Sequence, residues 1–322
     1  MCGLAGYVNV QQGEQRTALV RALGCATDKR GGHAAGYVGT VEASAVRYGR
    51  KLGQWADARA PFIAGAASAD LCIIHARYAT CGKKDTPLEA HPFAIKRAGR
   101  TALYGAHNGV LQGTAASAAR HGRAHDVDSR EAFELLADKA LDELATEISG
   151  YGTLAWIDGT LRDRVRLVTL TEGSDLEICR TACGALVWGS TWDIVHAGLA
   201  AAHMVALNGY RVEVGRVLEA HRDGLLTYAD HPRVTVSEYS RASFRADRVA
   251  AAYAAFDAFD AFDDAPACPA CASADTWEDE RDGLAYCVKC GHTWTYTTDV
   301  ADVDAAAFAA WLTSEREAHH AR

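Results

Sequence analysis

A cysteine occupies position 2 of the chain, directly after Met1 and before the run Gly-Leu-Ala-Gly. If Met1 is removed, Cys2 carries a thiol and a free α-amine on one residue. The amine then accepts the thiol proton directly or through one water, so no separate base is needed. The two groups titrate near ~8 and ~8.5, which nearly matches them for this transfer at neutral pH. The pattern predicts an N-terminal nucleophile; the alternative is an incidental cysteine before a first strand.

Five further short motifs follow Cys2 at defined intervals. They are Arg30-Gly31-Gly32-His33-Ala34-Ala35-Gly36, His75-Ala76-Arg77-Tyr78-Ala79-Thr80, Ala90-His91-Pro92-Phe93, His107-Asn108-Gly109-Val110 and Asp126-Val127-Asp128-Ser129. Each motif is weak by itself. In this order the set resembles the glutaminase domain of class II glutamine amidotransferases, and the resemblance covers roughly residues 2–228.

The resemblance implies a role for each residue that could do chemistry. Cys2 attacks the side-chain amide of glutamine, forms a γ-glutamyl thioester and releases ammonia. The Asn108 side chain and the Gly109 N–H stabilise the oxyanion, a contribution typically worth ~2.7–4 kcal/mol per donor. Arg77 clamps the substrate α-carboxylate with its planar fork, which lysine lacks. Asp128 pairs with the α-ammonium group.

Three more residues take supporting roles under the same resemblance. Thr80 and His91 contact or frame the bound glutamine, and Arg30 braces the nucleophile loop. Each assignment has a simpler alternative, since Arg77 could be a surface strand residue, Asp128 a helix cap and His91 a loop histidine. Together, the six motifs favour the glutaminase site.

Two positions depart from the family pattern. His33 stands where an acidic residue usually follows Arg-Gly-x, and Tyr78 where a tryptophan often follows the arginine. The tyrosine is a mild change. The histidine removes a carboxylate that organises the loop over the nucleophile, so we expect slow turnover or dependence on a partner.

A second strong signal lies near the C-terminus. Its four cysteines, in a C-x2-C-x15-C-x2-C pattern typical of a zinc ribbon, are Cys268, Cys271, Cys287 and Cys290. Four thiolates without an open position predict a structural Zn²⁺. The aromatic residues of this segment could stack on nucleic-acid bases, but its acidic loop at 278–282 repels phosphate, which favours a protein-contact or purely structural role. The five scattered cysteines at 25, 72, 81, 179 and 183 are interpreted as small buried hydrophobes.

The elements that must position these residues follow from hydrophobic periodicity. Strands are predicted at 4–10, 71–79, 101–111, 154–157, 165–170 and 186–188, with hairpins at 34–49 and 210–228. Helices are predicted at 16–27, 128–148 and 191–207, the second capped by Asp128 or Ser129. With the resemblance, this predicts an α+β fold: a four-layer αββα N-terminal nucleophile hydrolase sandwich. The expected domains are a glutaminase domain (2–230), a helical linker (231–266), the zinc ribbon (267–297) and a C-terminal helix (298–322).

Composition limits the remaining functions. The chain has 322 residues, 49% of them hydrophobic, and a net charge of −8, which argues against a general nucleic-acid or membrane-surface binder. No apolar run is long enough to span a bilayer and no secretory signal is evident, so we expect a cytoplasmic protein. No acceptor-domain motif appears, so the ammonia goes to a separate synthetase subunit or glutamine is simply hydrolysed. The alternative from another class is a non-catalytic assembly protein that docks a partner through the ribbon.

Overall fold

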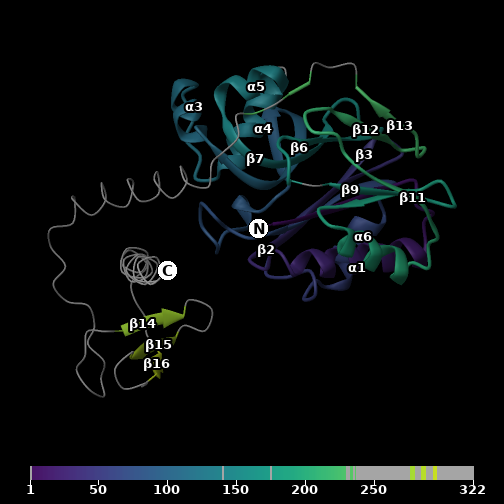
Figure 1. Ribbon diagram of the computed structural model, residues 1–322, viewed down its shortest axis with the longest axis horizontal. Coiled ribbons are helices and arrows are strands. Elements are labelled where there is room, and N and C mark those ends of the chain that lie inside the picture. Colours follow the sequence, from purple (N-terminus) through teal and green to yellow (C-terminus); the bar gives the residue numbers. More distant parts are fainter. Residues whose placement is uncertain are drawn as a thin grey trace, which may run out of the picture. The chain divides into compact units, whose positions relative to one another are not determined.

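The structure is a computed structural model that describes residues 2–139, 141–174, 176–229, 233, 234 and 236, and three short strands between 276 and 295. The chain divides into two compact units, Met1–Tyr239 and Ser240–Arg322. The described part of the second unit is an antiparallel sheet (Figure 1). Its strands, in order, are β14 (Thr276–Asp279), β15 (Leu284–Cys287) and β16 (Thr293–Thr295).

The first unit contains two antiparallel sheets. A seven-stranded sheet has the order β11-β9-β10-β1-β4-β2-β3, and a six-stranded sheet has the order β13-β12-β8-β7-β6-β5. The strands of the first are β1 (Gly3–Val8), β2 (Ala34–Val41), β3 (Ala45–Leu52), β4 (Leu71–Arg77), β9 (Glu177–Thr181), β10 (Leu186–Gly189) and β11 (Ala206–Arg211). Those of the second are β5 (Phe93–Arg97), β6 (Arg100–Gln112), β7 (Ser149–Asp158), β8 (Arg164–Thr169), β12 (Leu218–His221) and β13 (Leu226–Tyr228).

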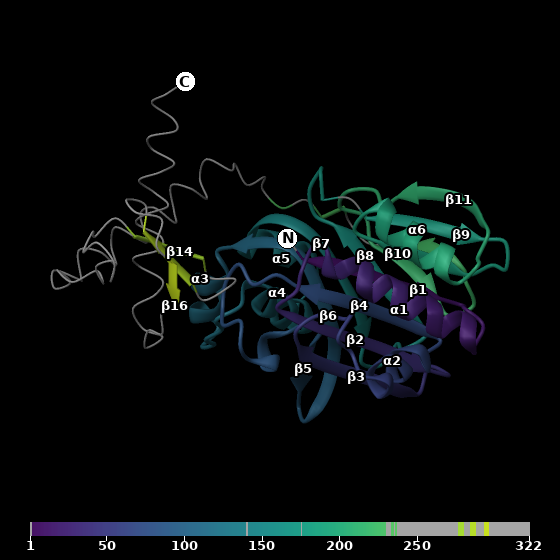
Figure 2. The ribbon, with the colours of Figure 1, turned by 90° about the horizontal axis from the view of Figure 1, so that it is seen from below.

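Helices cover the outer face of each sheet (Figures 1 and 2). The helices over the seven-stranded sheet are α1 (Glu14–Asp28), α2 (Ala60–Ala67) and α6 (Trp192–Ala201). Those on the side of the six-stranded sheet are α3 (Thr114–Arg120), α4 (Asp128–Asp138) and α5 (Leu141–Glu147), with α3 packed on α4. A 3₁₀ turn, η1 (Pro87–Glu89), precedes β5. The predicted four-layer αββα sandwich is therefore confirmed. Within the described ranges no helix is both long and apolar enough to cross a membrane.

The middle strand β1 shows how the sequence produces these layers. Alternate residues of a strand point to opposite faces. Leu4 and Val8 therefore enter the core between the two sheets, while Tyr7 enters the core beneath α1 and α2. Gly6 lies on the inter-sheet face, where a Cβ atom would come within 2.1 Å of the Trp188 ring. The strand is apolar on both faces because both are covered.

Two predicted helices differ from those observed. The single helix expected over 128–148 is two helices, because Lys139 takes extended backbone angles (φ −134°, ψ 164°) after its N–H closes α4 on the Leu135 carbonyl. The helix expected over 191–207 ends at Ala201, and His203 then adopts a positive φ of 51°. The following residues instead form β11, which pairs with β9.

The hairpin expected over 210–228 is also shorter than predicted. Only β12 and β13 form it, with the turn at 222–225, and they extend the six-stranded sheet. The start of the expected hairpin, Tyr210, belongs to β11 in the other sheet. Alternating polarity identified the strands here but not the sheet to which each belongs.

Candidate active site

Cys2 lies immediately before β1, which pairs with β4 on one side and β10 on the other; Gly3 is opposite Ala76 and Ala5 is opposite Gly189. The residue is 8% exposed. Its Sγ accepts a hydrogen bond from the Tyr78 N–H at 3.3 Å and donates to the Tyr78 carbonyl at 3.5 Å. Because β4 ends at Arg77, the N–H and carbonyl groups of Tyr78 are not used in the sheet and can both bond the thiol.

Burial raises the pKa of the Cys2 thiol, and the hydrogen bond from the backbone of Tyr78 opposes that rise in part. Desolvation disfavours the charged thiolate, so the resting group at neutral pH is the thiol. A reaction at this sulfur therefore needs a proton acceptor at the moment of attack.

A small pocket opens at the Cys2 side chain. Its lining comes from segments far apart in the sequence: Cys2, Arg77, Tyr78, Thr80, Cys81, His91, His107, Gly109, Val127, Asp128 and Ser129. The pocket brings together six of the predicted site residues, namely Cys2, Arg77, Thr80, His91, Gly109 and Asp128. Its volume is about 10 Å³, room for about one water molecule, so a substrate enters only if the surrounding loop moves.

Arg77 anchors that loop, which we define as residues 78–86. The side chain is 2% exposed and donates to the carbonyls of Lys83 and Cys81 at 2.5 and 2.8 Å. It also forms an ion pair with Glu89 at 3.3 Å, and the same carboxylate accepts the Lys83 N–H. The guanidinium at the pocket is thus held in place by backbone carbonyls and one acid.

Asp128 is the first residue of α4, and the N-cap is Val127, so the expected capping role is not the observed one. One carboxylate oxygen accepts the Leu111 N–H at 2.8 Å. The other accepts the Ser129 N–H at 2.7 Å, the Ser129 hydroxyl at 3.0 Å and the Cys81 thiol at 3.3 Å. These four donors hold the Asp128 carboxylate in the pocket wall, which the Arg77 side chain also lines.

Three histidines are buried in or beside the pocket: His75, His91 and His107. Burial lowers the pKa of each, for His75 to about 3. The His91 ring lies 4.3 Å from that of His75, and neither nitrogen of His91 has a hydrogen-bond partner. Buried polar atoms usually have partners, so both ring nitrogens of His91 are available to a polar group that enters the pocket. Gly36 makes room for this segment, because a Cβ there would lie 1.9 Å from the His91 carbonyl oxygen.

Gly109 lines the pocket, and the two predicted residues that do not, Asn108 and Arg30, lie beside it. Gly109 in β6 cannot be replaced by a larger residue, because a Cβ would come within 2.1 Å of the Tyr151 carbonyl oxygen. Asn108 is half-buried next to it, opposite Thr153 of β7, and is not among the lining residues. Arg30 is also outside the lining, and its Nε donates to the Cys2 carbonyl at 3.1 Å.

The sequence analysis gave Cys81 and Ser129 no role at the site. Cys81 was interpreted as a buried hydrophobe, but it is half-buried, lines the pocket and bonds Asp128. The same interpretation is wrong for Cys183, which is exposed. The position of Cys81 directly after the Arg77–Thr80 motif was the one signal that could have placed it at the site.

The described residues contain no group of three or more His, Cys, Asp or Glu side chains placed to hold a metal. Of the predicted zinc ligands, Cys268, Cys271 and Cys290 lie outside the described residues. Cys287 is described only as the last residue of β15, opposite Thr276 of β14.

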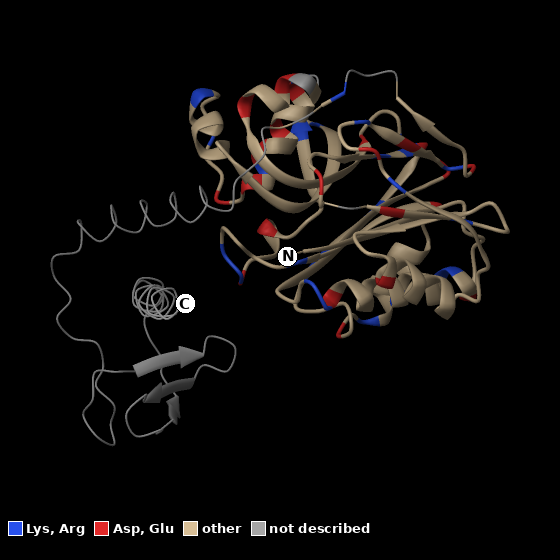
Figure 3. Ribbon diagram, viewed as in Figure 1, with Lys and Arg blue, Asp and Glu red and all other residues tan. Residues whose placement is uncertain are grey.

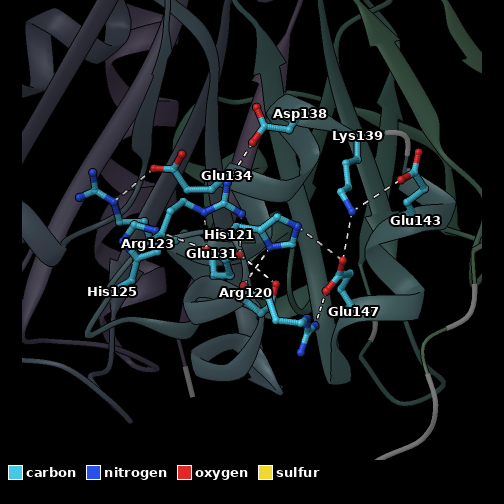
Figure 4. Close-up of polar contacts among 12 residues, drawn as sticks. Arg120, His121, Arg123, His125, Glu131, Glu134, Asp138, Lys139, Glu143 and Glu147 are labelled. Carbon is cyan, nitrogen blue, oxygen red and sulfur yellow. Dashed lines mark hydrogen bonds and ion pairs between the residues drawn. The ribbon is translucent and has the colours of Figure 1, made fainter.

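Charged residues of both signs occur on and around α3, α4 and α5 (Figure 3), and their side chains form an ion-pair network that supports α4 (Figure 4). Glu131 is 1% exposed, and Arg123 contacts both of its oxygens, at 2.7 and 3.0 Å. Arg123 also reaches Asp138 at 2.9 Å, and Arg97 bonds both Asp138 and Glu134. The network fixes the helix whose first residue is Asp128.

The fold has counterparts among solved structures. One is glutamine phosphoribosylpyrophosphate (PRPP) amidotransferase from B. subtilis complexed with ADP and GMP, with a TM-score of 0.56 and 16% identity over 71% of this chain and 49% of that chain. Another is described as the allosteric regulatory enzyme of purine biosynthesis, with a TM-score of 0.57 and 16% identity over 71% of this chain and 48% of that one. The chain therefore spans about half the length of each. The first unit has the αββα fold of N-terminal nucleophile hydrolases. No protein-family model and no curated protein matches the chain.

Proposed function

We propose that the protein is a glutamine amidotransferase of class II that hydrolyses the side-chain amide of glutamine with Cys2 as N-terminal nucleophile. The observation that carries the proposal is the pocket itself. A thiol, a guanidinium and a carboxylate from Cys2, Arg77 and Asp128 line one small cavity, although they lie far apart in the chain. A free amino acid carries an α-carboxylate, which the Arg77 guanidinium can bind, and an α-ammonium group, which the Asp128 carboxylate can bind.

The proposed reaction begins when the α-amine of processed Cys2 takes the thiol proton as Sγ bonds to the amide carbon of glutamine. The proton then passes to the amide nitrogen, the C–N bond breaks, and ammonia leaves a γ-glutamyl thioester. Water hydrolyses the thioester to glutamate and restores the thiol. The Gly109 N–H and the Asn108 amide are proposed as oxyanion donors. The unpartnered His91 is proposed to frame the substrate, which supplies the partners that its ring lacks.

Entry of glutamine requires the 78–86 loop to open, because the pocket holds about one water molecule. We propose that the substrate α-carboxylate replaces the carbonyls of Cys81 and Lys83 on Arg77. The ammonia is proposed to pass to an acceptor on a separate protein, which co-purification would identify.

The test is ammonia release from glutamine by the chain with and without Met1, with intact mass as the measure of processing. The processed chain should release ammonia, and Cys2→Ala should abolish release without lowering the unfolding midpoint. Cys183→Ser, at an exposed thiol, is the matched control and should retain activity. Equal release by Cys2→Ala and the unsubstituted chain would refute the proposal, and a processed chain inactive on glutamine would favour the non-catalytic assembly protein.

A further inference from the structure

Cys81, in the 78–86 loop, contacts both of the charged groups to which the substrate is proposed to bind. Its carbonyl oxygen accepts a hydrogen bond from the Arg77 guanidinium at 2.8 Å. Its thiol donates to one oxygen of the Asp128 carboxylate at 3.3 Å. Cys81 therefore offers Arg77 an acceptor and Asp128 a donor, as the α-carboxylate and the α-ammonium group of an amino acid would.

The two groups of Cys81 are also connected much like those of a free amino acid. In both molecules the oxygen acceptor belongs to a carbon that is bonded directly to Cα. The donor of the amino acid is the nitrogen on that same Cα, and the cysteine sulfur is one bond further away. One residue can thus satisfy both charged groups, and the cavity that remains has a volume of about 10 Å³. Glutamine does not fit while Cys81 is in this position.

The residues that follow Cys81 hold this part of the loop in place. Arg77 also donates to the Lys83 carbonyl at 2.5 Å, and the Glu89 carboxylate accepts the Lys83 N–H. Gly82 connects the two carbonyls on Arg77 and has a positive φ of 73°. A Cβ atom at Gly82 would lie 2.3 Å from a Glu89 carboxylate oxygen. The turn that brings both carbonyls to Arg77 therefore requires a glycine.

The Cys81 thiol and the His91 ring show what the loop supplies and what it does not. Burial, followed by the charge of the Asp128 carboxylate, raises the pKa of the Cys81 thiol to about 12. The thiol therefore keeps its proton at neutral pH and remains a donor. His91 lines the same pocket, and both of its ring nitrogens lack a hydrogen-bond partner. The loop thus supplies partners to Arg77 and Asp128 and leaves His91 without one.

We propose that Cys81 is a built-in competitor of the substrate: it takes the place of the α-carboxylate and α-ammonium groups, and a free α-amino acid displaces it on binding. The inference rests on the proposed function, which assigns these two substrate groups to Arg77 and Asp128. The apparent affinity for the substrate is then reduced to the fraction of molecules in which the loop has left these residues. Cys81 thus affects KM and leaves kcat unchanged.

The first experiment measures glutamine kinetics of Cys81→Ala and Cys81→Ser in the full chain. Cys81→Ala loses the bond to Asp128, so KM should fall by about twofold to tenfold, the range that one hydrogen bond contributes, with kcat unchanged. The inhibition constant of L-glutamate should fall by the same factor, because both ligands compete with the same loop. Cys81→Ser keeps a donor and should retain the KM of the unsubstituted chain. A KM that rises or stays constant in Cys81→Ala would overturn the competition.

Alkylation of Cys81 gives a second reading that needs no turnover. Full-length Cys2→Ala is treated with iodoacetamide at one pH, and the peptide containing Cys81 is quantified by mass spectrometry. Saturating L-glutamine should speed its alkylation about tenfold or more, because a thiol that leaves Asp128 regains a pKa near ~8.5. The exposed Cys183 is the internal control and should react at a constant rate. 4-Carbamoylbutanoate, which is glutamine without the α-ammonium group, should not speed the reaction.

Gly82→Ala, added to Cys2→Ala, tests the resting contact without a ligand. Alanine is strained at a φ of 73°, so the loop should leave Arg77 and Asp128 more often and Cys81 should react about tenfold faster. If the unsubstituted chain hydrolyses glutamine but glutamine leaves the alkylation of Cys81 unchanged, the competition is overturned and the proposed function stands. If the processed chain releases no ammonia, the proposed function fails, while alkylation with L-glutamate still shows whether an amino acid displaces Cys81.

Discussion

Nδ1 of His107 lies 2.9 Å from the hydroxyl of Ser129, and this contact joins β6 to the first turn of α4. The same hydroxyl donates to Asp128 at 3.0 Å, so it must accept from His107, whose proton is therefore on Nδ1. A buried, neutral histidine thus supports the carboxylate of the pocket through one serine. Burial lowers the pKa of His107, as it does for His75 and His91.

The buried histidines should make the fold sensitive to acid. The pKa of His75 falls from 6.5 to about 3 on burial, so between these values the unfolded chain binds a proton that the folded chain does not. The unfolding free energy should then drop on acidification below pH 6.5, by up to ~1.4 kcal/mol per pH unit for each such histidine. His75→Gln, which keeps a donor for the His107 carbonyl, should reduce this slope in denaturant titrations at several pH values. His196→Gln, at an exposed site, should leave it unchanged. An unaltered slope in His75→Gln would contradict the neutral state assigned to His75.

Arg77→Lys should lower kcat/KM for glutamine by about tenfold to a hundredfold, since a hydrogen bond to a charged group is worth ~1.5–3 kcal/mol. Lysine keeps the charge but loses the planar fork that reaches the carbonyls of Cys81 and Lys83 and a substrate carboxylate. Steady-state kinetics with glutamine and with an amide lacking the α-carboxylate measure the effect. Arg47→Lys, at an exposed residue of β3, serves as control. Equal rates on both amides by the unsubstituted chain would refute the role given to Arg77.

Arg123→Ala should destabilise the first unit by ~3–5 kcal/mol, because it leaves the Glu131 carboxylate buried without its main partner. Figure 4 shows Glu131 inside the network that connects α3, α4 and α5. Arg222→Ala breaks the more exposed pair with Asp70, at 3.5 Å, and should cost no more than ~1 kcal/mol. Chemical denaturation of both variants gives the comparison. Similar losses of unfolding free energy in the two variants would mean that burial does not determine how much the Arg123–Glu131 ion pair stabilises the protein.

Purified protein should contain one zinc per chain, bound by the four cysteines at 268, 271, 287 and 290. Cys287→Ser should lower the metal content, and Cys183→Ser should not. Removal of the metal by a chelator should leave glutamine hydrolysis intact, because Cys2, Arg77 and Asp128 belong to the first unit. Metal analysis alongside ammonia release provides the measurement. Activity lost in proportion to the zinc would place the ion in the chemistry instead.

The resemblance carried by six short motifs predicted the layers, and six of the residues that it singled out line the pocket. The strand at β1 was recognisable as a short apolar run, and the helix at α1 from the helical spacing of its apolar residues. The break at Lys139 was not, since the pattern of apolar residues continues across it. Long-range contacts were likewise hidden: the position of Cys81 after the Arg77–Thr80 motif suggests the site, but it does not indicate that the thiol bonds Asp128. A contact of His33 was hidden in the same way, since its Nδ1 accepts the Ala79 N–H from the loop that follows β4.

The pairing of β1 with β10 has a consequence for synthesis of the chain. β1 leaves the ribosome first, but the partner of Ala5 is Gly189, so one edge of β1 stays open until most of the first unit has been made. Pairing between such distant segments is slow, and domains fold as units during synthesis. The N-terminus is thus accessible to a methionine aminopeptidase for many seconds before Cys2 is enclosed. Arrested nascent chains that end before residue 186 should therefore already lack Met1, so that the proposed nucleophile would be uncovered before it is buried.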